Sequence, residues 1–106
     1  MLLGIRHTGI IVKDIERAVE FYIGLGFFIR SKNNEVWNND LFQIIKLEAP
    51  DGNIIELIEG NHLPHIALQV DNISDYDSHP TITKEGFKVT FIKDPDGNII
   101  ELVQRV

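Results

Sequence analysis

The octapeptide Pro-Asp-Gly-Asn-Ile-Ile-Glu-Leu occupies residues 50–57 and returns unchanged at residues 95–102. Each copy begins with a sequence that is typical of a tight turn, because Gly accepts a positive φ and Asp caps the turn. Each copy then continues into β-branched residues that favour a strand. The repeat therefore predicts two related units, each ending in a hairpin.

The strand of each copy carries one carboxylate, and the alternation of side chains along the strand determines which face it occupies. Successive side chains of a strand point to opposite faces, so Glu56 shares a face with Ile58, and Glu101 shares a face with Val103. A charge among apolar neighbours is costly unless another group pairs with it. We therefore expect each glutamate to have a partner.

The composition restricts the kind of site that the chain can build. There is no cysteine, which excludes disulfides, thiolate metal ligands and a cysteine nucleophile. A metal would have to be held by His, Asp or Glu. The formal net charge of −6 at pH 7 disfavours nucleic acid or an anionic membrane as the main partner.

The distribution of apolar residues argues against a membrane protein. No apolar run approaches the ~18 residues of a membrane helix. Charge interrupts the first residues before the core of a signal peptide forms. We therefore expect a cytoplasmic protein with no membrane contact.

The first half of the chain, about residues 1–60, predicts the order βαβββ. Residues 4–12 alternate as a strand that carries His7 and Gly9 on the same face. Asp14 occupies a helix N-cap position, apolar residues follow at helical spacing, and Gly26 is one of two glycines that close the helix. Strands at residues 27–32 and 41–48 follow, with a polar connection at residues 31–40 between them.

The second half, about residues 61–106, repeats this plan in shorter form. His65 and Ala67 share a strand face, as His7 and Gly9 do. The second turn follows its histidine after 30 positions (residues 65 to 95), compared with 43 (residues 7 to 50) in the first half. A parallel crossover needs about a dozen residues or more, so we expect the second helix to be reduced to a single turn or the next strand to be nearly lost. The predicted fold class is α+β, with two tandem βαβββ modules that form mixed sheets within a single domain of residues 1–106.

Each half contributes one histidine on its first strand and one glutamate on its last strand. A lone histidine or glutamate on a strand is more often structural, but recurrence at equivalent positions favours a shared role. Two imidazoles and two carboxylates suit a first-row metal. The small residues Gly9 and Ala67 leave room for a ligand above it. The candidate metal ligands are His7, Glu56, His65 and Glu101.

The sequence resembles the vicinal oxygen chelate superfamily, which includes glyoxalase I, bleomycin resistance proteins and extradiol dioxygenases. The motifs that carry the resemblance are a His-x-x-Ile-x-Val strand at residues 7–12, the helix at residues 14–22, the Gly-Leu-Gly-Phe bend at residues 24–27 and both turns. Together they span essentially the whole chain. The resemblance implies two βαβββ modules whose cupped sheets curl around a metal, with ligands on the first and fourth strands of each module.

The resemblance also implies a small-molecule substrate or ligand and a reaction class. An octahedral ion with four protein ligands keeps two neighbouring positions for substrate oxygens, which suits a lyase or isomerase that stabilises an enediolate. Glu56 or Glu101 would be the catalytic base. The metal could be zinc, nickel, cobalt, manganese or iron(II). A fourth ligand candidate argues against the extradiol dioxygenase branch, which uses two histidines and one carboxylate.

The sequence leaves open a second function, allows three candidate cations for substrate binding and predicts an assembly state. The protein could instead be a non-catalytic binder of small molecules, as bleomycin resistance proteins are. Arg6, Arg30 or Lys46 could hold an anionic group of the substrate, although surface lysines and arginines are usually solvated. We expect a homodimer, because open sheets leave strand edges and apolar faces that pairing can cover.

Overall fold

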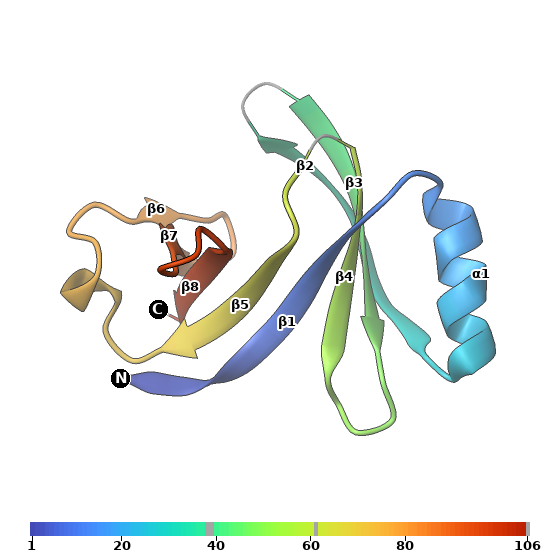
Figure 1. The fold of residues 1–106 in the computed structure, drawn as a ribbon, viewed down its shortest axis with the longest axis horizontal. Helices are drawn as coiled ribbons and strands as arrows, with labels where there is room; N and C mark the ends of the chain where they lie inside the picture. The colour runs from blue at the N-terminus through green and yellow to red at the C-terminus, as the bar shows by residue number, and fades with distance from the viewer. Residues whose placement is uncertain (38–39, 61, 106) are drawn as a thin grey trace. The chain divides into compact units, whose positions relative to one another are not determined.

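A computed structural model describes residues 1–37, 40–60 and 62–105 of the chain. It confirms the α+β class and the two βαβββ-like modules, the second of them shortened (Figure 1). The chain divides into two compact units. The first unit is His7–Pro64, and the second unit combines Met1–Arg6 with His65–Val106.

The first unit contains one helix and a mixed sheet with the strand order β2-β3-β4-β1. The strand β1 is parallel to β4, whereas β2 and β4 are antiparallel to β3. The elements are β1 (Leu2–Val12), α1 (Ile15–Leu25), β2 (Phe28–Trp37), β3 (Asp40–Glu48) and β4 (Ile54–Glu59). Figure 1 shows α1 alongside this sheet.

The helix α1 begins and ends at the predicted residues. The side chain of Asp14 accepts a hydrogen bond from the backbone N–H of Arg17 over 3.3 Å, which caps the first turn. Gly26 ends the helix in the left-handed region at φ 117°. Ile15 and Val19 are buried against the sheet. No helix among the described residues is long and apolar enough to cross a membrane.

The two faces of the first sheet carry different apolar clusters. Leu57 of β4 packs with the helix, together with Ile45 and Leu47 of β3. Ile58, one residue further along β4, belongs with Phe42 to the second cluster. Side chains two residues apart share a face of a strand, so Glu56 shares a face with Ile58, as the alternation predicted, and this face lies opposite the helix.

The second unit keeps the plan but loses the helix. Its strand order is the beginning of β1, then β5-β8-β7-β6, with β5 parallel to β8. The elements are β5 (His65–Val70), the 3-10 turn η1 (Ile73–Asp75), β6 (Thr81–Ile82), β7 (Phe87–Lys93) and β8 (Ile99–Arg105). Ile73 of η1 packs against Val70 and Leu102, so a single turn covers the face where the first unit has a helix.

The strand β1 starts earlier than predicted and belongs to both units, so the strands form one mixed eight-stranded sheet, whereas the sequence predicted a separate sheet in each module. It begins at Leu2 rather than at residue 4. Its first residues belong to the second unit, in which β1 is the neighbour of β5. The backbone N–H of Asp71 donates to the carbonyl of Met1 over 3.2 Å, and the N-terminal ammonium lies 2.8 Å from the Asp71 carboxylate.

The strand β2 is longer than the sequence indicated. The prediction ended this strand at residue 32 and assigned residues 31–40 to a polar connection, but β2 continues to Trp37 and β3 begins at Asp40. Residues 38–39 of that connection lie outside the described residues. At the edge of the sheet, the polar side chains of Asn33, Asn34 and Glu35 are exposed, so their polarity does not oppose strand formation.

The two copies of the octapeptide form similar turns with different caps. Gly52 and Gly97 both adopt the predicted positive φ, at 88° and 85°. In the first turn Asp51 accepts from the backbone N–H of Asn53 over 3.1 Å. In the second turn the corresponding acceptor is Asp94, which precedes the octapeptide and accepts from the backbone N–H of Asn98 over 2.9 Å.

Candidate metal centre

The first unit places His7 of β1 next to Glu56 of β4. The His7 Nε2 atom lies 3.5 Å from the Glu56 Oε2 atom, and both residues are buried. In the parallel register of these strands Gly9 is the partner of Glu56, so the smallest residue lies beside the carboxylate. We expected Glu56 to have a partner, and that partner is His7.

A lysine accompanies this pair on the adjacent strand. Lys46 of β3 is the antiparallel register partner of Glu56. Its Nζ atom lies 3.9 Å from the Glu56 Oε2 atom, and its side chain is 30% exposed. The carboxylate thus has an imidazole and an ammonium group as neighbours.

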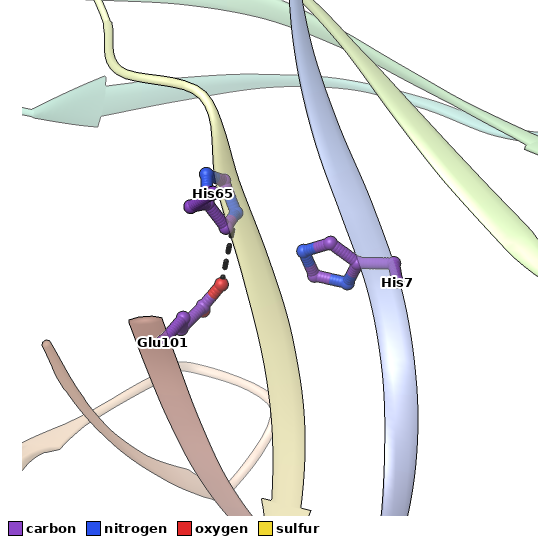
Figure 2. A group of neighbouring side chains, drawn as sticks. All are labelled: His7, His65 and Glu101. Carbon is purple, nitrogen blue, oxygen red and sulfur yellow. Dashed lines mark ion pairs between the residues drawn. The ribbon is translucent and has the colours of Figure 1, made fainter. Parts of the chain in front are cut away.

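The second unit places His65 of β5 next to Glu101 of β8 (Figure 2). The His65 Nε2 atom lies 3.1 Å from the Glu101 Oε2 atom. Ala67 is the parallel register partner of Glu101, which matches the place of Gly9 in the first unit. Phe91 of β7 is the antiparallel partner of Glu101, and its ring centroid lies 6.2 Å from that of His65.

The donor atoms of each pair fit a divalent first-row metal. Imidazole nitrogen and carboxylate oxygen are ligands for zinc, nickel, cobalt, manganese and iron(II). A histidine beside a glutamate can also be a plain ion pair when the imidazole is protonated. Burial of both histidines and recurrence of the pair in both units favour a shared chemical role over two separate ion pairs.

The structure adds two polar residues that sequence reasoning missed. Glu59 accepts a hydrogen bond from the backbone N–H of Ile15 over 2.7 Å. Gln104 accepts from the backbone N–H of Ile73 over 2.8 Å. Glu59 follows Glu56 by three positions, and Gln104 follows Glu101 by three. An alignment of the two halves that continues past the octapeptide pairs Glu59 with Gln104 and indicates that they have an equivalent role.

The sequence comparison identifies a family. Residues 4–79 match the sequence model of a family described as the Glyoxalase/Bleomycin resistance protein/Dioxygenase superfamily. The match includes the first histidine–glutamate pair and His65. No curated protein sequence matches the chain.

The fold is similar to solved structures over nearly the whole chain. Methylmalonyl-CoA epimerase from Mycobacterium tuberculosis is 20% identical, with a TM-score of 0.76, over 99% of this chain and 89% of that chain. A hypothetical protein from Bacillus halodurans is 21% identical, with a TM-score of 0.72, over 96% of this chain and 94% of that chain.

A mutant of glyoxalase I from Zea mays is also similar. It is 17% identical, with a TM-score of 0.65, over 98% of this chain but only 43% of that chain. At these identities the similarity establishes the fold but not the activity, which has to be inferred from the residues of the site.

Proposed function

Because the chain belongs to the Glyoxalase/Bleomycin resistance protein/Dioxygenase superfamily, we propose that it is a divalent-metal-dependent lyase or isomerase. Its substrate is a small molecule with neighbouring oxygen atoms. The observation that carries the proposal is the histidine–glutamate pair that recurs at equivalent strand positions, with 3.5 Å between the partners in one unit and 3.1 Å in the other. Of the four residues, His7, Glu56 and His65 are buried, and Glu101 is partly buried.

The proposed ligands of a single ion are the two pairs together: His7, Glu56, His65 and Glu101. The pairs come either from one chain or from two subunits of a dimer. Two neutral imidazoles and two carboxylates offset the charge of a divalent cation, which supports this ligand set. When bound, the ion would stabilise negative charge that develops on substrate oxygens.

The residues of the chain supply the proton chemistry. Glu56 or Glu101 is the group that removes a proton from the carbon beside a carbonyl and returns it. One structural neighbour is named an epimerase. Inversion of a centre beside a carbonyl begins with this proton removal and ends when a proton returns to the opposite face. The low exposure of both carboxylates, at 10% and 15% of the side chain, limits competition from water.

Metal stoichiometry is the experiment that tests the proposal. We expect purified protein, dialysed with cobalt, nickel or zinc, to retain one ion per chain by elemental analysis. Two ions per chain would mean that the pairs act separately. No retained ion would overturn the proposal in favour of a metal-independent binder of small molecules.

Mixing two inactive chains distinguishes the two origins of the ligands. One variant combines His7→Ala with Glu56→Gln, and the other combines His65→Ala with Glu101→Gln. We expect neither variant alone to retain metal. If refolding them together restores metal uptake, each site draws its pairs from two subunits. If it does not, the four ligands belong to one chain.

We also propose that the protein is a homodimer. Several large apolar side chains are exposed, among them Leu3 and Ile5 of β1 and Phe21 and Leu25 of α1. Leu3 and Ile5 share one face of β1, and Phe21 and Leu25 lie one turn apart on α1. Adjoining exposed apolar groups commonly mark an interface between protein chains. Light scattering at high micromolar concentration should give twice the mass of the chain, and a monomeric mass would contradict the proposal.

A further inference from the structure

The two histidine–glutamate pairs differ in one strand neighbour. The antiparallel partner of Glu56 is Lys46 on β3, whereas the antiparallel partner of Glu101 is Phe91 on β7. The repeat therefore places a cation beside one carboxylate and an aromatic ring at the equivalent place beside the other.

The ammonium group of Lys46 has hydrogen-bonding capacity to spare. Its 3.9 Å distance from Glu56 is an ion pair, but it exceeds the roughly 3.2 Å limit of an N–H···O hydrogen bond. Within residues 1–37, 40–60 and 62–105, Lys46 makes no hydrogen bond through its side chain. An ammonium group has three N–H donors, so it can bind another anionic group without giving up a hydrogen bond.

Metal binding changes the net charge of the groups around Lys46. Without a metal, the negative charge of Glu56 offsets the ammonium charge. When Glu56 binds a divalent cation, Lys46 lies beside a centre whose charge the two carboxylates already balance. The summed charge of ion, carboxylates and ammonium is then positive, and a positive site of low exposure attracts anions.

We propose that Lys46 determines specificity by binding a carboxylate on the substrate, next to the oxygens that approach the metal. This inference rests on the proposed metal-dependent function. The substrate class is a small oxo or hydroxy compound that carries a carboxylate. The ring of Phe91 makes the second pair unsuited to the same role, so a single anionic group is recognised.

The test compares two chelators that differ by one carboxylate. Acetohydroxamate binds metals through two oxygens, and malonohydroxamate adds a carboxylate to the same group. The affinity of cobalt-loaded protein for each is measured by calorimetry and by the visible spectrum of the ion. We expect wild-type protein to prefer malonohydroxamate by about tenfold, on the order of one ion pair of low exposure.

Three variants identify the source of the preference. Lys46→Met should abolish it, and Lys46→Arg should keep it because the positive charge remains. Lys32→Met is the matched control, since it removes the same charge from an exposed position on β2 of the same unit. Lys32→Met should leave the preference unchanged. A preference that is absent in wild-type protein, or that survives in Lys46→Met, would overturn the inference.

Metal affinity supplies a second readout that separates this inference from misfolding. Removing a cation beside a metal ligand should make Lys46→Met bind cobalt several times more tightly, whereas a misfolded variant would bind it more weakly. Unchanged or weaker cobalt binding in a folded Lys46→Met protein would contradict the inference while leaving the proposed metal site intact. If wild-type protein retains no metal, the proposed function fails, and this inference fails with it.

Discussion

The side chain of Glu59 at the end of β4 accepts a hydrogen bond from the backbone N–H of Ile15 at the start of α1, over 2.7 Å. Gln104 does the same for Ile73 in the second unit, over 2.8 Å. One repeat uses a carboxylate and the other an amide oxygen, so the interaction needs an acceptor rather than a charge. The contact fixes the segment after the first strand of each module to the last strand.

The first prediction concerns this contact. Glu59→Ala removes the acceptor for a partly buried N–H and should lower the free energy of unfolding by about 1–2 kcal/mol. Glu59→Gln keeps an acceptor, as Gln104 does, and should cost much less. Urea denaturation of both variants measures the difference. Equal losses would show that the charge of Glu59, and not its acceptor oxygen, is what matters.

The second prediction uses Glu59→Gln as a control for the metal centre. Glu56→Gln and Glu59→Gln make the same change of charge three positions apart on β4. Glu56→Gln should weaken metal binding by more than about 100-fold, because even groups that only orient the ligands are worth about 10–100-fold. Glu59→Gln should bind metal as wild-type protein does. Competition with a coloured chelator gives both constants, and similar constants would remove Glu56 from the ligand set.

The third prediction concerns Gly60, which follows β4. Its φ is +136°, and a Cβ atom built there would lie 2.6 Å from the Cδ1 atom of the buried Phe42. Gly60→Ala combines backbone strain with a clash and should destabilise the protein by about 2–4 kcal/mol. Gly52→Ala is the control: φ is +88° and nothing lies within 4 Å, so only strain is expected. Thermal unfolding should rank Gly60→Ala well below Gly52→Ala.

The fourth prediction concerns the capped turns and acid. Hydrogen bonds from the side chain and backbone of Asn98 lower the pKa of Asp94, and those from the backbone and side chain of Asn53 lower the pKa of Asp51. A carboxyl whose pKa is lowered on folding stabilises the protein above its unfolded pKa of about 3.9. That stabilisation is lost as the pH falls through the folded pKa.

Alanine variants of the two caps should therefore approach wild-type stability in acid. At neutral pH, Asp51→Ala should be the less stable of the two variants. The reason is that Asp96 occupies in the second turn the place of Asp51 in the first, and it can replace Asp94 as the acceptor. In the first turn the place of Asp94 is taken by Ala49, which has no acceptor. Urea denaturation from pH 7 to pH 3 checks both statements. A larger loss in Asp94→Ala would contradict the replacement.

The repeated octapeptide made much of this fold predictable. It located the last strand of each module, and alternation then placed each glutamate on one face of that strand. In the structure this face lies opposite α1 in the first unit and opposite η1 in the second. The sequence also indicated the loss of the second helix, because too few residues separate His65 from the second turn. Each predicted histidine–glutamate pair is adjacent within its unit, whereas the joint use of both pairs by one metal stays a prediction.

Other features depend on pairing between strands, which residue patterns do not reveal. Lys46 becomes a neighbour of Glu56 only through the register of β3 with β4. The polar residues of β2 look like a loop because an edge strand with exposed faces has no apolar alternation to detect. The early start of β1 depends on β5, which is distant in the sequence, so local reasoning placed the boundary at residue 4.

The boundary between the units, after Arg6, affects the order in which a growing chain can fold. Residues 1–6 are synthesised well before β5, the strand that they accompany, which begins at His65. The first unit is complete in sequence by Pro64 and can assemble during translation, whereas the second needs residues 1–6 as well as the residues from His65 onward. Leu2, Leu3 and Ile5 therefore cannot pair with β5 until residues 65–70 have been synthesised. The contact between Met1 and Asp71 joins residues that are distant in the sequence, so it forms late.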